Sequence, residues 1–417
     1  MALSSFFPAP ADSLSLLTQL AIILAVGIIS KAISNKTKLP FIVLLIFFGT
    51  LLASMGALNL RLLGTLPETL RVLALIIVVF SAGFHLKLRE VKADGRLILS
   101  LVTIGVFLTM FIIGGITFFL LSIPLISAIA LGALLSGSDS AAISSAEETG
   151  KESRVKTILV TESVFNQPLT LILPLILLDY LVKPELAWLN VPKFFVMLIV
   201  GGVVGIGGAF WGQKILDASR HKQEEIVGLM IAIGVYVIAE NFLGSGIVAV
   251  AITSLLLGSE GKSEKKLLGQ FTDQLAFLFT IFVFILLGMQ FTFSELFSLG
   301  ISRYEIIVIV IALVVARMAS VLLVTYKSDL GTMQRIKLGL IAPNGISPAA
   351  MAPLFVAYGI TGSQVILKIV YIAIVVSVFI SIMAFRFSAG PKSIEAQRAE
   401  KKEEREEKKE RLNKAEP

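Results

Sequence analysis

The sequence predicts an all-α polytopic membrane protein with about 13 transmembrane helices, built as two inverted repeats with crossed broken helices. Of the 417 residues, 56% are apolar and 16% are charged, whereas roughly a quarter of the residues in a soluble domain are charged. The apolar residues form runs of about 20, the length that a spanning helix needs. Polar residues, Gly and Pro interrupt two of these runs. This composition excludes a soluble enzyme, a disordered chain and a nucleic-acid binder that folds in water.

Charged residues, Gly and Pro bound the apolar runs, and each run is a predicted spanning helix. In chain order the runs cover residues 13–30, 39–57, 69–86, 97–121, 123–146, 157–182, 194–213, 226–243, 245–258, 270–290, 304–326, 336–358 and 363–385. The loops after odd-numbered runs contain nineteen Lys and Arg when Lys337, at the start of run twelve, is included, whereas the N-terminus and the even-numbered loops contain four. Because cytoplasmic loops are enriched in Lys and Arg, we expect the odd-numbered loops and the C-terminus inside and the N-terminus outside.

The chain divides into a transmembrane part and a tail. Residues 1–390 form the membrane domain, with repeats at about 13–182 and 226–385, and residues 391–417 form a charged cytoplasmic tail. We expect the tail to be solvated and partly helical, with partner binding or regulation as the alternative. Cysteine is absent and there are two histidines, so we expect no disulfide framework and no His or Cys metal cluster. No cofactor and no removable signal peptide are expected.

Runs five and twelve are predicted to be broken helices. The breaks contain Gly137, Ser138, Asp139 and Ser140 in run five, and Pro343, Asn344 and Gly345 in run twelve. Non-helical backbone survives at membrane depth only when it is buried in protein or lines a watery cavity. The two runs are seven apart, so they occupy equivalent positions if runs one to six and runs eight to thirteen are two copies of one unit. An odd offset makes the two copies inverted in the membrane. Such paired breaks are typical of a transporter's binding site near the midplane; the alternative is two ordinary Pro or Gly kinks.

Asp139 is the carboxylate at a predicted break. An ion at mid-bilayer depth needs a partner or a function, because its burial costs at least roughly 2.5–3.5 kcal/mol. A carboxylate at this position can hold a proton or a small cation such as Na⁺ or K⁺, and competition between the two is the basis of exchange. The alternative is a structural Asp that caps the second half of its own broken helix through the amides of residues 140–142.

The run after the first break contains further polar residues. Glu162 and Arg317 are predicted to form a buried ion pair that braces the broken helices, because a guanidinium stays charged and can bind a carboxylate at two points. Direct coordination of the ion by Glu162 is the alternative. Asn166 and Gln167 carry amide oxygens that can coordinate Na⁺ or K⁺ or cap a half-helix, and neither side chain can titrate.

Five segments together resemble a known family. They are SGSDSAA at 136–142, TESVFNQP at 161–168, AENFLGSGIVAVAITSLLLG at 239–258, ARMAS at 316–320 and APNGISPA at 342–349. These segments resemble motifs of the monovalent cation:proton antiporter superfamily. In the same order, the motifs are its Thr-Asp-Pro break, its Glu-Ser-Leu-x-Asn-Asp helix, its Ala-Glu-x-x-x-x-Ser-Gly-x-x-Ala segment, its Arg-Pro helix and its Ala-Pro-Arg-Gly break. The resemblance lies on the sodium/proton exchanger side and covers most of residues 13–387.

The resemblance implies a six-helix core domain, a dimerisation domain, a homodimer and elevator-like alternating access. It places Ser138 and Asp139 at the cation site of the first break, Glu162 and Ser163 on the acid and serine of the next core helix, Asn166 on the Asn of the Asn-Asp pair, and Arg317 on the arginine that partners the Glu.

Two positions depart from the family pattern. Gln167 stands where the family has the Asp of its Asn-Asp pair, and Asn344 stands where it has the arginine of the second break. Three explanations for Gln167 remain open. Asp139 has taken over the titrating role, or the chain carries a substitution that mimics a protonated Asp, or the protein is not an ordinary proton-coupled exchanger.

Two classes of function follow. The first is a secondary antiporter of a prokaryotic cell membrane that moves Na⁺, K⁺ or Li⁺ against H⁺, with Asp139 as the ion ligand and Ser138, Ser163, Asn166 and Gln167 supplying neutral oxygens. The second is a channel, a transporter of another solute or a sensor on the same scaffold. The expected partners are membrane lipid, a second copy of the chain and the transported ions, and no nucleic acid is expected. An intramembrane enzyme has no supporting motif.

Overall fold

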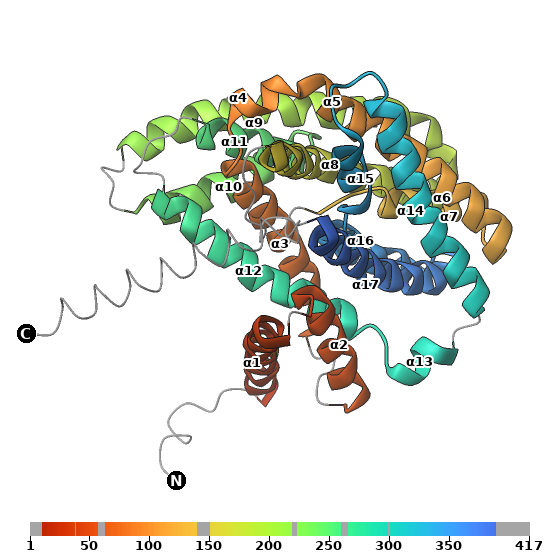
Figure 1. Cartoon of the computed structure of the whole chain (residues 1–417). Coiled ribbons are helices and arrows are strands. Elements are labelled where there is room, and N and C mark those ends of the chain that lie inside the picture. Colours follow the sequence, from red (N-terminus) through yellow and green to blue (C-terminus); the bar gives the residue numbers. More distant parts are fainter. Residues whose placement is uncertain are drawn as a thin grey trace, which may run out of the picture.

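The computed structural model describes residues 11–37, 39–56, 63–139, 151–218, 223–259, 266–298 and 301–388. All regular elements within these ranges are helices (Figure 1). In chain order they are α1 (Ala11–Thr37), α2 (Phe41–Ser54), α3 (Leu66–Phe84), α4 (Leu88–Ala93), α5 (Gly95–Ser100), the π-helical turn η2 (Leu101–Gly105), α6 (Val106–Leu121), α7 (Leu125–Leu135), α8 (Lys151–Val182), the 3₁₀ turn η3 (Pro184–Leu189), α9 (Asn190–Ala218), α10 (Glu224–Asn241), α11 (Gly246–Gly258), α12 (Lys266–Gly288), α13 (Phe293–Ser298), α14 (Arg303–Thr325), α15 (Thr332–Leu340), α16 (Ile346–Ala357) and α17 (Ser363–Ser388).

The predicted all-α polytopic fold is confirmed. Eight described helices are long and apolar enough to cross a membrane, and α2, α7, α11 and α16 are shorter apolar helices. Helix α7 is short because the fifth run stops being helical after Leu135, and α16 is short because the twelfth run divides into α15 and α16. The charged tail expected at 391–417 lies outside the described residues.

Contacts between loops agree with the predicted sides of the membrane, which follow from the alternation of Lys-rich and Arg-rich loops with loops that have few basic residues. Arg154, at the start of α8, donates hydrogen bonds to Asp94 between α4 and α5 and to Asp329 between α14 and α15. These segments belong to the loops after runs three, five and eleven. On the even-numbered side, the amide of Phe293 donates to Ser54 Oγ at 3.0 Å. Each contact joins loops that the alternation places on the same side of the membrane.

The helices form two groups. The core helices are α5–α8 and α14–α17, and the flanking helices are α1–α3 and α9–α12. In the core, α7 packs against α6, α8, α16 and α17, and α14 packs against α6 and α15. In the flanking group, α3 packs against α11 and α12, and α2 packs against α12 (Figure 1). Helices α3 and α12 both contact α16, so the flanking group lies directly beside the second broken run.

Glycines bring two pairs of flanking helices into backbone contact. A Cβ on Gly288 of α12 would lie 2.3 Å from the carbonyl oxygen of Ile46 in α2, and one on Gly258 of α11 would lie 2.0 Å from that of Phe84 in α3. No side chain fits at either distance. Small residues allow this close packing of membrane helices. If the two repeats are equivalent, α2 corresponds to α11 and α12 to α3, so the two crossings are equivalent contacts.

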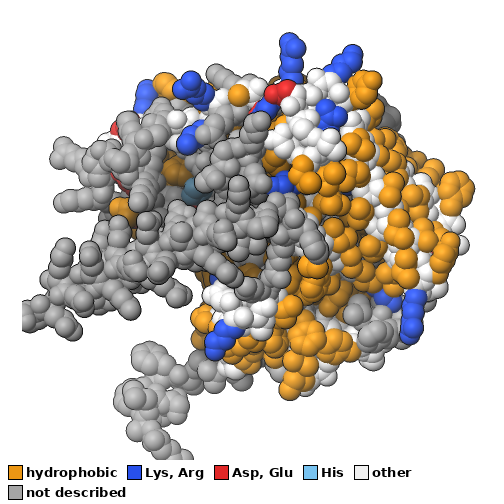
Figure 2. Space-filling view, in the orientation of Figure 1, with side chains coloured by type: hydrophobic (Ala, Val, Ile, Leu, Met, Phe, Trp, Pro, Cys, Tyr) orange, Lys and Arg blue, Asp and Glu red, His pale blue; other side chains and the backbone are white. Residues whose placement is uncertain are grey.

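The outer surface is apolar in a broad band. Figure 2 shows hydrophobic side chains over the face that carries α6, α7 and α14, with Lys and Arg gathered along the upper edge near α4 and α5. Large hydrophobic side chains on this band and elsewhere are exposed, among them Phe119, Ile199, Ile311 and Trp211. Such a surface is unfavourable in water and stable against hydrocarbon, as expected for spanning helices.

Candidate functional site

The two breaks lie against each other, so the residues that interrupt the fifth and twelfth runs form one site. Helix α7 ends at Leu135, and non-helical backbone follows as far as Asp139. Residues 341–345 are the non-helical segment between α15 and α16. The amide of Asp139 donates a hydrogen bond to the carbonyl oxygen of Pro343 at 2.8 Å. Backbone groups freed from helices need partners inside the membrane, and here one break supplies a partner to the other.

The carboxylate of Asp139 caps the helix that follows the other break. The amide of Ile346, the first residue of α16, donates to Asp139 Oδ2 at 2.7 Å. Gly345 makes this approach possible, because a Cβ there would lie 1.8 Å from Asp139 Oδ2. Asp139 is 2% exposed, and the positive end of the α16 dipole favours negative charge at this position. The cap predicted at residues 140–142, Ser140 included, lies outside the described residues.

Asn344 joins the second break to the end of α7. Its side-chain Nδ2 donates to the carbonyl oxygens of Leu135 at 2.9 Å and Gly137 at 3.0 Å, and its backbone amide donates to Ser377 Oγ at 3.0 Å. The last carbonyls of a helix have no partner within it, and Asn344 supplies one for α7. A neutral amide therefore holds the breaks together where the family pattern has an arginine.

One face of α8 lies against the first break. Ser163 Oγ donates to the carbonyl oxygen of Ser138 at 3.0 Å, and a Cβ on Gly137 would lie 2.8 Å from Thr170 Cγ2. Gln167 is four residues after Ser163 and three before Thr170, so it lies on the same helix face. The structure thus brings Ser138 and Ser163 together, and helical spacing places Gln167 on the same face of α8.

The predicted ion pair is present on a neighbouring face of α8. Arg317 Nη1 and Nη2 donate to the two oxygens of Glu162 at 2.5 and 2.7 Å. The Glu162 side chain is 0% exposed and that of Arg317 is 12% exposed. Arg317 Nη2 also donates to the carbonyl oxygen of Leu338 in α15 at 3.3 Å. The pair therefore ties α8 and α14 to the helix before the second break, and Asn166 lies one turn after Glu162.

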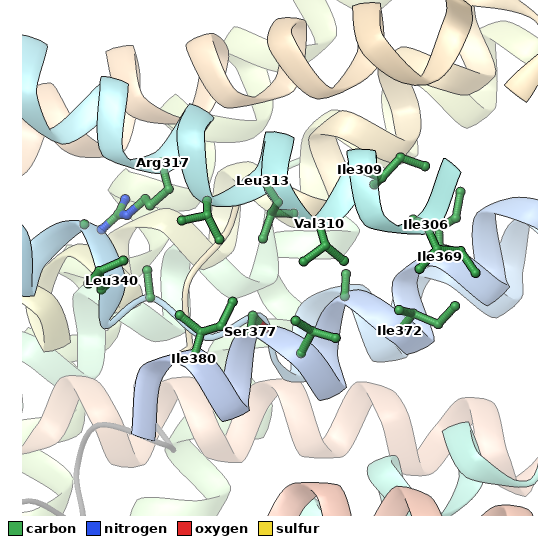
Figure 3. Close-up of a pocket in the computed structure, with 15 residues that line it drawn as sticks. Ile306, Ile309, Val310, Leu313, Arg317, Leu340, Ile369, Ile372, Ser377 and Ile380 are labelled. Carbon is green, nitrogen blue, oxygen red and sulfur yellow. The ribbon is translucent and has the colours of Figure 1, made fainter. Parts of the chain in front are cut away.

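An apolar cavity separates α14 from α17 and reaches Arg317 at one end (Figure 3). Aliphatic side chains form most of its wall, including Ile306, Leu313, Ile372 and Ile380. No carboxylate lines it, and the one charged group, Arg317, is already paired with Glu162. A cation would find no ligand of opposite charge in this cavity, so the breaks form the better ion site.

Buried polar atoms without a hydrogen-bond partner among the described residues concentrate at the breaks and on α8. Apart from Arg317 Nε, they are Ser138 Oγ, Thr161 Oγ1, Asn166 Oδ1 and Nδ2, Gln167 Oε1, Asn344 Oδ1 and Ser347 Oγ. Native interiors leave few such atoms, so their concentration indicates a place where a ligand or water supplies partners. Sequence reasoning missed Thr161 and Ser347. The available signal for Ser347 was a hydroxyl in the first turn after a break.

The ligand set suits a monovalent ion. Within the described ranges, no three His, Cys, Asp or Glu side chains gather as they would around a multivalent metal. The site offers the carboxylate of Asp139 together with neutral hydroxyl and amide oxygens. One full negative charge and several neutral oxygens can replace the hydration shell of a singly charged cation.

Comparisons with known proteins agree with this arrangement. A family profile described as sodium/hydrogen exchanger, transmembrane, matches residues 21–386. A protein of Methanocaldococcus jannaschii named Probable Na(+)/H(+) antiporter 2 is 30% identical over 360 residues, which are 80% of this chain and 82% of the relative. A protein of Alkalimonas amylolytica named K(+)/H(+) antiporter NhaP is 23% identical over 374 residues, which are 86% of this chain and 63% of the relative.

A solved structure shares the fold. The sodium proton antiporter MjNhaP1 from Methanocaldococcus jannaschii matches with a TM-score of 0.78 at 22% identity, over 88% of this chain and 98% of that chain. The all-helical architecture described above is therefore the fold of that antiporter. Because the family profile covers most of the chain, from residue 21 to residue 386, this protein belongs to the sodium/hydrogen exchanger family.

Proposed function

We propose that this chain is a secondary-active antiporter that exchanges a monovalent cation for H⁺ by alternating access, and that Asp139 carries either ion. The observation that supports this most directly is the position of the Asp139 carboxylate at the junction of the two breaks, bonded to the first amide of α16. A buried carboxylate there is neutral when protonated and neutralised when it holds a cation. The two ions therefore compete for one group.

The side chain of Asp139 can bind and release a proton, whereas that of Gln167 cannot. An amide side chain has no ionisable proton, and Glu162 gives both of its oxygens to Arg317. This supports the first of the three explanations for Gln167, in which Asp139 is the exchanging group. Since a single carboxylate alternates between the ions, we propose that one cation moves for one proton.

The transported cation is the substrate, and no resident cofactor is proposed. The relatives named above are described as Na⁺/H⁺ and K⁺/H⁺ antiporters, so family membership leaves Na⁺, K⁺ and Li⁺ as candidates. The neutral oxygens of Ser138, Ser163, Asn166 and Gln167 are proposed as ligands beside Asp139. In this proposal Glu162 serves as a brace.

We also propose how the repeats, the subunits and the termini are arranged. Two inverted repeats, at about 13–182 and 226–385, are supported by the equivalent close crossings of α2 with α12 and of α11 with α3. We also propose a homodimer, with the N-terminus outside and the C-terminus in the cytoplasm. The sequence contains no cysteine, so single cysteines placed in successive loops would report sidedness by labelling without background. Cross-linking of the same variants would report a dimer.

Exchange assays in proteoliposomes test the function. The purified chain is reconstituted and a pulse of Na⁺, K⁺ or Li⁺ is applied over a range of pH, with Gln167→Asp measured in parallel. We expect the native chain to generate a cation-evoked pH gradient. If the native chain generates none while Gln167→Asp does, the native protein does not exchange, and the channel or sensor alternative replaces this proposal.

A further inference from the structure

The second break carries two polar side chains that the exchange mechanism does not use. Asn344 is 1% exposed and Ser347 is 4% exposed. Asn344 Oδ1 and Ser347 Oγ have no hydrogen-bond partner within the part of the chain that the structure describes. A buried polar atom without a partner destabilises the fold, and native proteins retain few of them. Oxygens of this kind beside a buried carboxylate fit a bound cation, which takes oxygen lone pairs as ligands.

Both oxygens belong to the segment that contacts Asp139. The amide of Ile346 donates to Asp139 Oδ2 at 2.7 Å; Asn344 lies two residues before this amide and Ser347 one residue after it. The side chain of Asn344 is fixed at the first break, because its Nδ2 donates to the carbonyl oxygens of Leu135 and Gly137. Its Oδ1 is the remaining acceptor on that amide.

Ser347 does not make the hydrogen bond that a serine in a membrane helix commonly makes. A serine in a membrane helix commonly donates its hydroxyl to the carbonyl four residues earlier, as Ser320 does to Ala316 at 2.8 Å. For Ser347 that carbonyl belongs to Pro343, which lies in the break and already accepts the amide of Asp139 at 2.8 Å. A carbonyl can accept two hydrogen bonds, yet the Ser347 hydroxyl has no hydrogen-bond partner within the described residues, so a bond to Pro343 does not account for it.

From this juxtaposition we infer that Ser347 and Asn344 are ligands of the transported cation and complete, from the α16 side, a site whose carboxylate is Asp139. The ligand is a dehydrated monovalent cation held by one carboxylate and neutral oxygens from both broken runs. This inference rests on the proposed exchange function. It adds that the second break contributes oxygens to the ion as well as a helix end to Asp139, so ion selectivity depends on α16.

Cation-dependent thermal stabilisation of the purified protein tests the inference. Melting is followed against NaCl, KCl or LiCl, with choline chloride holding the ionic strength constant. Ser347→Ala removes only the hydroxyl, and Ser320→Ala is the matched control because its hydroxyl is buried and hydrogen-bonded in the same core. Without added cation, we expect Ser347→Ala to melt at or above the native temperature and Ser320→Ala to melt below it.

With added cation, we expect the stabilisation midpoint of Ser347→Ala to rise about tenfold or more, and the order of preference among Na⁺, K⁺ and Li⁺ to change. The midpoint of Ser320→Ala stays native. If the native chain exchanges and Ser347→Ala keeps the native midpoint and ion order, this inference is overturned and the exchange function stands. If the native chain neither exchanges nor responds to cations, both are overturned. Should Ser347→Ala fail to fold, Ser347→Gly removes the same oxygen and takes the same titration.

Discussion

Two buried carboxylates, Glu162 and Asp139, lie in the same core and are held in different ways. Both oxygens of Glu162 are bound by the guanidinium of Arg317, at 2.5 and 2.7 Å. Oδ2 of Asp139 is bound by a neutral backbone amide at the start of α16, at 2.7 Å. The first arrangement cancels the charge permanently with a partner on another helix. In the second arrangement, a backbone amide holds Asp139 at the start of α16. That hydrogen bond brings no titrating or cationic side chain to the carboxylate.

The difference explains how one membrane core can contain a brace and an exchange site. A carboxylate held by arginine at two points gains little from a proton or a metal ion, because its charge and its lone pairs are already engaged. The amide bond at the helix end does not by itself balance the negative charge of Asp139, which a proton or a cation can balance. The contrast therefore predicts that changes at Asp139 alter transport, whereas changes at Glu162 and Arg317 alter stability.

The largest expected effect is the loss of exchange in Asp139→Asn. The amide cannot be protonated in this pH range and carries no charge to hold a cation, while its oxygen can still accept the Ile346 amide. We expect the cation-evoked pH gradient in proteoliposomes to fall to that of empty liposomes, with the melting temperature close to native. Asp329→Asn, an exposed Asp to Asn change at the Arg154 cluster, is the control and should keep exchange. Native-like exchange by Asp139→Asn would show that the two carboxylates do not differ in this way.

Arg317→Ala should have the next largest effect, on stability. It leaves a buried Glu162 without its counter-charge, which costs about 3–5 kcal/mol in buried ion pairs. We expect a large fall in melting temperature in detergent. Glu162→Gln in the Arg317→Ala background removes the stranded charge and should recover part of the loss. Unchanged melting of Arg317→Ala would count against the brace.

Ser163→Ala probes the support of Asp139 without altering either carboxylate. It removes the hydrogen bond to the buried carbonyl oxygen of Ser138, and a lost bond of this kind costs about 1 kcal/mol. We expect a small fall in melting temperature and a severalfold fall in exchange rate, because the first break loses its hydrogen bond to α8. Ser30→Ala, in flanking helix α1, should lower stability alone. If both variants exchange like the native chain, Ser163 does not position the break.

The smallest expected effect concerns a third carboxylate, Asp273, whose partner can titrate. His85 Nδ1 lies 2.8 Å from the carbonyl oxygen of Ser81, and Nε2 lies 3.3 Å from Asp273 Oδ2. Both ring nitrogens face acceptors, so the protonated ring fits best, and the hydrogen bond to Asp273 raises the pKa of His85 above its ordinary value of 6.5.

Because the pKa of His85 is raised in the folded state, its contact with Asp273 stabilises the protein at acidic pH. This stabilisation is fully present below the ordinary pKa and is lost as the pH rises through the folded-state value. The pair is half-exposed, so we expect at most about 1 kcal/mol. The difference in melting temperature between native and His85→Gln should be positive near pH 6 and vanish at alkaline pH. A difference that does not change with pH would show that the ring is not protonated in this contact.

The sequence predicted the broken runs and the Glu162–Arg317 pair because Pro, Gly and charged residues are conspicuous in apolar segments. The family resemblance added Ser163 to the expected ion site, and the structure places its hydroxyl against the first break. The broken runs and the ion pair depend on local pattern and on the energetic cost of burying charge.

The contacts between the breaks could not be predicted in the same way. Asp139 caps the helix that begins at Ile346, and no local pattern links residues so distant along the chain. Asn344 could be recognised as a departure from the family pattern, but its bonds to the end of α7 depend on how the two breaks meet. Ser347 lies in the first turn after a break, but serine is common in membrane helices, so its hydroxyl becomes informative only when the structure shows it buried and without a partner among the described residues.

Proton release on cation binding tests the central claim most directly. Na⁺, K⁺ or Li⁺ is added to the purified chain in weakly buffered detergent solution, and the protons released are counted for native protein and for Asp139→Asn. If Asp139 holds either ion, the native chain should release one proton for each cation bound, and Asp139→Asn should release none. Equal proton release from both proteins would contradict the account, because the exchanged proton would then come from another group.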